Sequence, residues 1–165
     1  MPRIDFDALP DDARLWVFGA SRPLHAEQAD LLLAEVDAFL GGWAAHGSPL
    51  TCARDWRHGR FLLVAVDERS VPPSGCSIDA MVRVLKELEA RLNASLVDNA
   101  PVWYRDGKGV VQASRSEFSR LARDGLVGPG TVVFDGTVTR VADVRAGAWE
   151  APARDTWHGK AFFGS

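Results

Sequence analysis

The sequence predicts an α+β fold in which two helices cover one face of an antiparallel sheet. Two segments, about residues 25–45 and 78–92, repeat apolar residues at steps of three and four, which is the spacing of a helix with one buried face. Short segments at 15–18, 50–56 and 61–66, the first and last of them apolar throughout, are predicted to be strands. Each helix therefore needs a single surface to cover, and the strands can form that surface.

The first strand and the first helix follow from apolar spacing. Leu15-Trp16-Val17-Phe18 is apolar throughout and ends at Gly19, which favours a buried strand over a helix. The next apolar residues lie on one stripe of a helix: Leu32, Val36, Phe39, Leu40 and Trp43. We expect this helix to end at Gly41-Gly42 or just before Gly47.

A hairpin and a second helix come next. His58-Gly59 is a turn signal between a strand at 50–56 and a strand at 61–66 that is apolar enough to be buried on both faces. Ser77 is well placed as the N-cap of the second helix. The apolar residues of that helix again follow helical spacing: Ile78, Met81, Val82, Leu85, Leu88 and Leu92.

The C-terminal third repeats strands and a helix on a smaller scale. We expect two hairpins, at 102–111 and 131–139, with Asp106-Gly107 and Asp135-Gly136 as their turns. Between them, Ser114-Arg115-Ser116-Glu117 has the pattern of a capping box and opens a short helix.

The order of the elements, with the strand at 102–104 as the sixth, is the βαββαβ order of a ferredoxin-like sheet. We accordingly expect residues 1–100 to form a ferredoxin-like α+β core. Residues 101–165 should form a small β-α-β extension that packs on this core. Such a fold carries many unrelated activities, so it predicts architecture and not function.

Composition and charge exclude several classes of protein. The formal net charge of -3, from 19 basic and 22 acidic residues, gives no general attraction to nucleic acid or to a membrane, and we expect neither as a partner. The first residues carry acids where a signal peptide has an apolar run, so we expect a cytoplasmic protein. Cys52 and Cys76 are too few for a disulfide scaffold and are interpreted as free thiols. We expect no cofactor.

Four motifs are spread over most of the chain: Trp43-Ala44-Ala45-His46-Gly47 with Pro49-Leu50, Val66-Asp67-Glu68, Ser74-Gly75-Cys76-Ser77-Ile78-Asp79, and Trp157-His158. Together they resemble a family of small uncharacterised bacterial proteins that are often labelled ABC transporter ATPases. The label implies ATP hydrolysis, which needs a Gly-x-x-x-x-Gly-Lys-Ser/Thr loop whose amides hold phosphate. The nearest string, Gly107-Lys108-Gly109, lacks the upstream glycine and the following hydroxyl, so we expect no ATPase activity.

A second set of residues lies between Trp103 and about Trp149: Trp103-Tyr104, Asp106-Gly107, Glu117-Phe118, Leu121, Gly125 and Thr131-Val132-Val133. Their spacing resembles that of GYF-type modules, which bind proline-rich peptides. The Gly-Pro-aromatic signature of those modules is absent. The resemblance implies a small module of similar shape.

The segment from Ser74 to Asp79 is the one we single out for chemistry. Cys76 lies just before the expected helix start, where unpaired amides and the positive end of the helix dipole favour a thiolate. A nucleophilic thiol also needs a base, and His46 and His158 are the candidates, with Asp79 as a partner for either. The alternatives are structural: Cys76 as a small buried residue, and Asp79 as a carboxylate that stabilises the helix dipole.

Four more residues are candidate ligand-binding residues around such a pocket: Trp43, Gly75, Ser77 and Trp157. His46 also fits a capping role at a helix end, and Trp157 also fits docking of the end of the chain. The candidate His, Cys and Asp residues do not have the short spacing of a zinc site, so we expect no metal.

Two functions are compatible with these residues. The first is a cytosolic protein with a pocket around Cys76 that binds a small ligand or uses its thiol, and enzymatic activity is left open. The second is a non-catalytic interaction module or adaptor that contacts another protein through the region from Pro101 onward.

Overall fold

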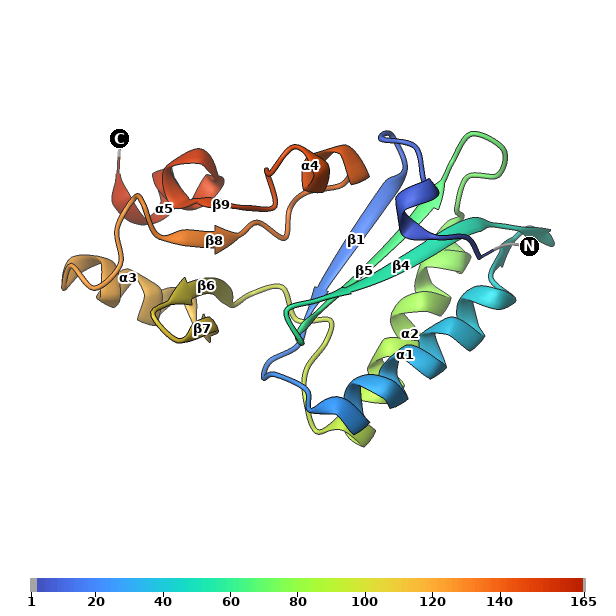
Figure 1. Cartoon of the computed structure of the whole chain (residues 1–165), viewed down its shortest axis with the longest axis horizontal. Coiled ribbons are helices and arrows are strands. Elements are labelled where there is room, and N and C mark those ends of the chain that lie inside the picture. The colour runs from blue at the N-terminus through green and yellow to red at the C-terminus, as the bar shows by residue number, and fades with distance from the viewer. Residues whose placement is uncertain (1–2, 165) are drawn as a thin grey trace. The chain divides into compact units, whose positions relative to one another are not determined.

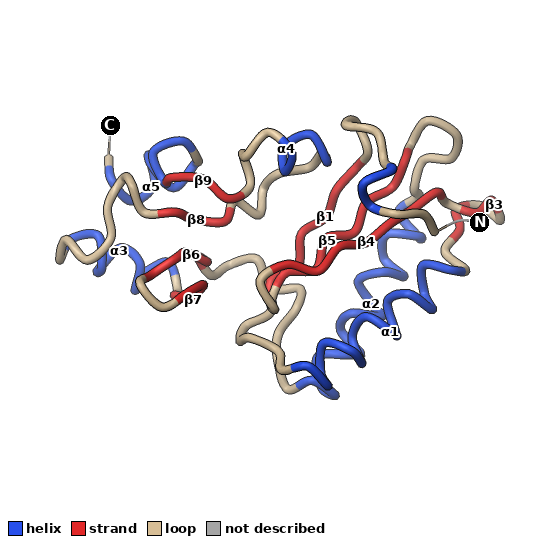
Figure 2. The backbone as a smooth tube through the Cα atoms, in the orientation of Figure 1, coloured by secondary structure: helices blue, strands red, loops and turns tan. Residues whose placement is uncertain are grey.

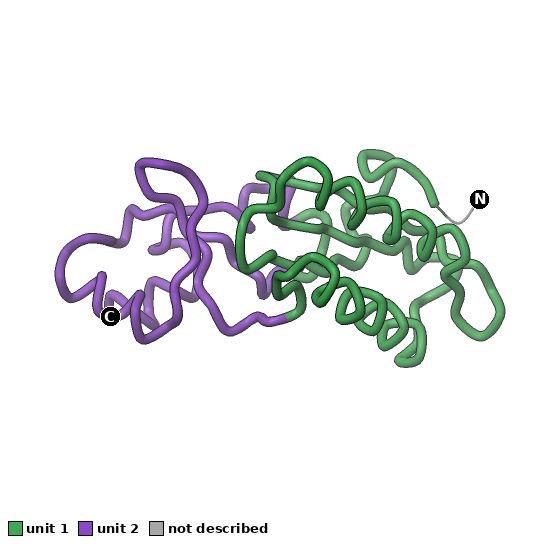
Figure 3. Tube along the Cα trace, turned by 90° about the horizontal axis from the view of Figure 1, so that it is seen from below, with its two compact units in different colours: residues 1–97, 139–142 green, residues 98–138, 143–165 purple. Residues whose placement is uncertain are grey.

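The computed structural model describes residues 3–164, and the chain divides into two compact units (Figure 1 and Figure 3). The first unit is Met1–Val97 with Thr139–Ala142, and the second is Asp98–Val138 with Asp143–Ser165. Both combine helices with antiparallel strands, which confirms the α+β class. No helix among residues 3–164 combines the length and the apolar character needed to span a membrane.

The first unit has a three-stranded antiparallel sheet in the order β1-β5-β4, formed by β1 (Arg14–Gly19), β5 (Phe61–Asp67) and β4 (Thr51–Arg57). Two long helices, α1 (Ala26–Gly41) and α2 (Gly75–Leu92), cover one face of this sheet (Figure 1 and Figure 2). The core between sheet and helices joins apolar residues of both: Phe18, Leu62, Val64, Leu32, Val36, Leu40, Met81, Leu85 and Leu88.

The central strand β5 is buried along its whole length, which accounts for its continuous apolar sequence. All seven of its residues are buried: β1 and β4 flank it, the two long helices cover one face of the sheet, and the short 3-10 helix η1 (Phe6–Ala8) contacts the neighbouring strand β4. Residues 58–60 connect β4 and β5, and both His58 (59°) and Gly59 (66°) have positive φ there, while the amide of Arg60 donates to the carbonyl of Arg57 (3.1 Å).

The predicted sixth strand does not join this sheet. β6 (Val102–Asp106) pairs instead with β7 (Gly109–Ala113) and with β8 (Val132–Phe134) in the second unit, so the ferredoxin-like layout is not confirmed. The free edge of β1 is partly covered by a distant segment. The amide of Leu15 donates to the carbonyl of Thr139 (2.9 Å), and the amide of Val141 donates to the carbonyl of Ala13 (3.0 Å).

The first helix ends at Gly41, as the first of its two expected ends predicts, and a small hairpin follows at residues 44–49. β2 (Ala44–Ala45) and β3 (Ser48–Pro49) are joined by His46 and Gly47, both with positive φ (51° and 80°). His46 is therefore a turn residue and not a helix cap.

The second unit has a four-stranded sheet in the order β7-β6-β8-β9, with β9 at Glu150–Pro152. Its helices are α3 (Arg115–Arg123) and α5 (Trp157–Phe163), with a 3-10 turn η2 at Ala153–Asp155. The short helix α4 (Val141–Arg145) contains the boundary between the two units, at residues 142 and 143. The first expected hairpin and the helix after Ser114 are confirmed. The second hairpin is wrong, because β8 pairs with β9 and residues 137–139 form no strand beside it.

Phe118 is the centre of the second core. It is fully buried and meets Tyr104, Phe162 and Phe163 edge-on, with ring centroids 5.2, 4.8 and 6.2 Å away. Aromatic pairs of this geometry are favourable beyond the area they bury. The last helix is therefore held against α3 and β6 within its own unit.

Candidate functional site

The start of α2 is built by a reciprocal pair of serines. Ser74 is the N-cap: its hydroxyl accepts from the amide of Ser77 (3.1 Å), while the hydroxyl of Ser77 accepts from the amide of Ser74 (2.7 Å). The expectation that Ser77 is the N-cap is wrong by one turn, because Ser77 is the third residue of the helix and is buried. Gly75 and Cys76 are consequently the first two residues of α2, and both are exposed.

Trp43 fixes the hairpin at residues 44–49 against this helix start. Its indole N–H donates to the carbonyl of Ser77 (2.8 Å), and its ring packs against Trp16 and Phe39 with centroids 6.1 and 5.4 Å away. Only 3 % of Trp43 is exposed. Trp43 and Ser77 thus meet, as the prediction of one local cluster requires, but both are used in packing and hydrogen bonding of the scaffold.

The proposed catalytic side chains of the first unit are not assembled into a relay. Cys76, His46 and Asp79 are all exposed, and within residues 3–164 none of the three makes a side-chain hydrogen bond or an ion pair. The alternative that Cys76 is a small buried residue is wrong. Its role as a nucleophile stays a prediction.

Cys52 has the opposite environment. It is fully buried in β4, its thiol donates to the carbonyl of Leu40 (3.6 Å), and burial raises the pKa of that thiol to about 11. Both cysteines are free, as the sequence indicates.

Trp157 and His158 belong to the second unit, whereas Cys76, His46 and Asp79 belong to the first. Only 2 % of His158 is exposed, and its Nδ1 lies 2.8 Å from the hydroxyl of Thr156. Burial lowers the pKa of His158 to about 4, with a smaller raising effect of Asp135. The ring is therefore neutral at pH 7 and serves the packing of α5.

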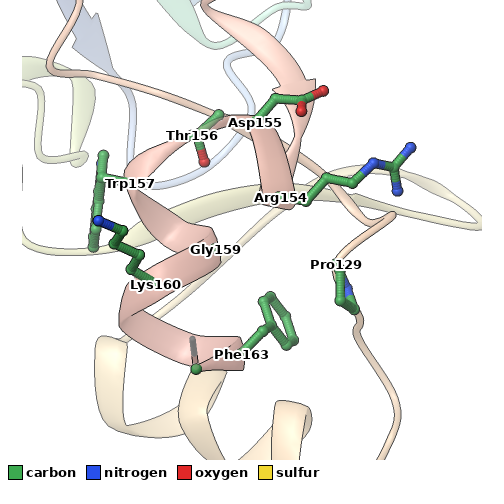
Figure 4. Close-up of a pocket in the computed structure, with 9 residues that line it drawn as sticks. Pro129, Arg154, Asp155, Thr156, Trp157, Gly159, Lys160 and Phe163 are labelled. Carbon is green, nitrogen blue, oxygen red and sulfur yellow. The ribbon is translucent and has the colours of Figure 1, made fainter.

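A groove of about 520 Å³ lies along α5 in the second unit and is shown in Figure 4. We call it the α5 groove; it is lined by Pro129, Arg154, Asp155, Thr156, Trp157, Gly159, Lys160, Phe163 and Gly164. Phe163, Pro129 and Arg154 lie together on one side of α5, and Trp157 lies with Lys160 on the other (Figure 4).

The aromatic side chains of the α5 groove are half-buried and rigidly supported. The ring of Trp157 stacks on His158 at 3.9 Å between centroids, and the guanidinium of Arg115 lies 5.1 Å from its centre. Phe163 packs against the core residue Phe118. Each ring thus has one side held by the protein and part of its surface open to solvent.

Gly159 allows α5 to approach η2 closely. A Cβ at this position would lie 3.0 Å from the carbonyl oxygen of Ala153 and 3.1 Å from the Cα of Arg154. A larger residue would push α5 away from η2, so the glycine sets the distance between Arg154 and the helix. The α5 groove depends on this close contact.

Sequence reasoning missed α5, although one signal was present. Thr156 is its N-cap, since its hydroxyl accepts from the amide of His158 (3.2 Å), and threonine is a favoured residue at that position. The helix has only seven residues, which is too short to show apolar periodicity.

The glycine-lysine-glycine string does not form a phosphate-binding loop. It lies in the β6–β7 turn, where one carboxylate oxygen of Asp106 accepts from the amides of Lys108 (2.7 Å) and Gly109 (3.2 Å). Those amides are already occupied. Among residues 3–164, no three His, Cys, Asp or Glu side chains cluster in a way that could hold a metal ion.

Comparisons of the chain with protein-family models, with curated proteins and with solved structures found no match.

Proposed function

We propose that the chain is a protein-interaction module and that its second unit binds an extended, proline-containing segment of another protein in the α5 groove. The observation that carries this proposal is that Trp157 and Phe163, both half-buried, line the α5 groove and are each supported by a buried ring. Half-exposed aromatic residues at a supported surface are typical of interaction sites.

Proline is the ligand residue that fits this surface best. An extended proline-containing segment already has the polyproline II conformation, so it loses little entropy when it docks on aromatic rings. Pro129, also exposed, continues the apolar surface beside Phe163. The region from Trp103 to about Trp149 resembles GYF-type modules in the spacing of its residues, which implies a small module of similar shape.

The test is binding of fluorescent ten-residue peptides, with alternating prolines or with alanine at the same positions, to the full chain. The proline peptide should bind, and Trp157→Ala or Phe163→Ala should weaken it at least tenfold, which corresponds to about 1.4 kcal/mol. Leu126→Ala is the matched control, because Leu126 is 70 % exposed in the same unit and does not line the groove.

Equal binding of the two peptides, or full affinity in Trp157→Ala, would refute the proposal. Circular dichroism and thermal melting of each variant separate a lost contact from a lost fold.

A second candidate function is thiol chemistry at Cys76. The observation that favours it is the exposure of this thiol in the first turn of a well-capped, 18-residue helix, where nearby amides are not used within the helix. A cytoplasmic location, as expected from the sequence, would keep such a thiol reduced.

For the first unit we propose a ferredoxin-like variant. The order β1-β5-β4 and the two helices on one face support it, and residues 139–142 lie where part of a fourth strand would pair with β1.

A further inference from the structure

The α5 groove contains cations without partners. Arg154 and Lys160 are exposed, and within residues 3–164 neither side chain makes a hydrogen bond or an ion pair. Two other arginines of the second unit are paired: Arg105 with Glu150 (2.8 Å), and Arg120 with Asp124 (3.6 Å). Arg154 and Lys160 are thus available to a ligand in the groove.

These cations line the same groove as its aromatic side chains. In Figure 4, Arg154 lies on the same side of α5 as Phe163 and Pro129, and Lys160 lies on the side of Trp157. Asp155 is the one carboxylate among the nine groove residues, and it forms no ion pair with either cation. The groove residues therefore carry two positive charges against one negative charge.

We infer that the segment bound in the α5 groove carries acidic side chains next to its proline residues, an inference that rests on the proposed function. A carboxylate next to a proline on Phe163 would pair with Arg154, whose planar guanidinium donates two parallel hydrogen bonds to a carboxylate. A second carboxylate can reach Lys160 across α5. The partner is thus an acidic, proline-containing segment.

We expect the charges of Arg154 and Lys160 to favour acidic peptides over neutral ones without supplying most of the binding free energy. Exposed ion pairs contribute little free energy, whereas charges at the rim of an interface accelerate association and make it salt-dependent. We therefore expect an acidic peptide to bind about fivefold more tightly than its neutral counterpart at low salt. This preference should disappear at high ionic strength, because salt screens exposed charges.

The test uses three peptides with identical prolines and with glutamate, glutamine or lysine at the flanking positions. The wild-type chain should bind them in the order glutamate, glutamine, lysine, and Arg154→Glu with Lys160→Glu should reverse that order. Both side chains are exposed, so the double variant should keep its fold, which thermal melting checks.

The outcomes separate this inference from the proposed function. If the glutamate and glutamine peptides bind equally, the inference is overturned and the proline-binding proposal stands. If none of the three binds, both are overturned. Tighter binding of a single-stranded oligonucleotide than of the glutamate peptide would also overturn the inference that the ligand is an acidic, proline-containing segment. If the double variant unfolds, the inference is tested with the wild-type chain alone. It then requires that the peptides bind in the order glutamate, glutamine, lysine at low salt and that this order disappears at high salt.

Discussion

Protonation of His158 should destabilise the protein between pH 6.5 and pH 4. Its pKa is about 4 in the folded protein against an ordinary value of 6.5, because burial disfavours the charged ring. The unfolded chain therefore binds the proton more tightly. The stabilising contribution is complete above pH 6.5 and is lost as the pH falls toward 4.

The magnitude follows from the two pKa values. Their difference corresponds to about 3 kcal/mol of unfolding free energy at neutral pH, of which about 2 kcal/mol is lost by pH 5. Only 2 % of His158 is exposed, so solvent screens this effect little. The pKa of Asp37 is lowered by its hydrogen bond from Arg54, so protonation of Asp37 changes the stability only below its ordinary pKa of 3.8. Asp37 therefore does not contribute to the change in stability between pH 6.5 and pH 4.

The assay is urea unfolding at pH 7 and pH 5, followed by tryptophan fluorescence, together with NMR titration of the imidazole ring. His158→Gln removes the titrating group, so its unfolding free energy should change much less between pH 7 and pH 5 than that of the wild-type chain. His25→Gln is the control and should keep it, because His25 is exposed and its side chain caps no helix. A His158 ring that titrates near pH 6.5 in the folded protein would refute the reasoning.

Three more outcomes are expected. Cys76 should react with iodoacetamide at pH 8 at least a hundredfold faster than Cys52, which is fully buried with a pKa of about 11; equal rates in the folded protein would exclude a special role for Cys76. Gly159→Ala should cost about 1–3 kcal/mol of stability and weaken peptide binding, since its Cβ would meet the carbonyl of Ala153, whereas Gly128→Ala, with open space around it, should not. Calorimetry with ATP and magnesium should show no saturable binding, because the phosphate-binding loop of ATPases is absent and the amides of Lys108 and Gly109 in the β6–β7 turn already bind Asp106. Saturable binding would contradict this.

The sequence determined the local elements of the first unit and the turns between them. Helical spacing of apolar residues located α1 and α2, and the apolar run at 61–66 located the central strand, because these patterns express burial directly. The turn His58-Gly59 followed from residues that accept positive φ. The helix start was misplaced by one turn, since Ser74 and Ser77 both have the side chain of an N-cap.

Only the tertiary structure decided which strands pair and which side chains are accessible. β6 has the pattern of a strand for either sheet, and its pairing with β7 and β8 depends on contacts between distant segments. The short α5 has too few residues for periodicity, so the groove beside it is invisible in the sequence. His158 and Cys76 were alike as candidate reactive groups. Packing buried the first and left the second exposed, because burial depends on neighbours brought together by the fold.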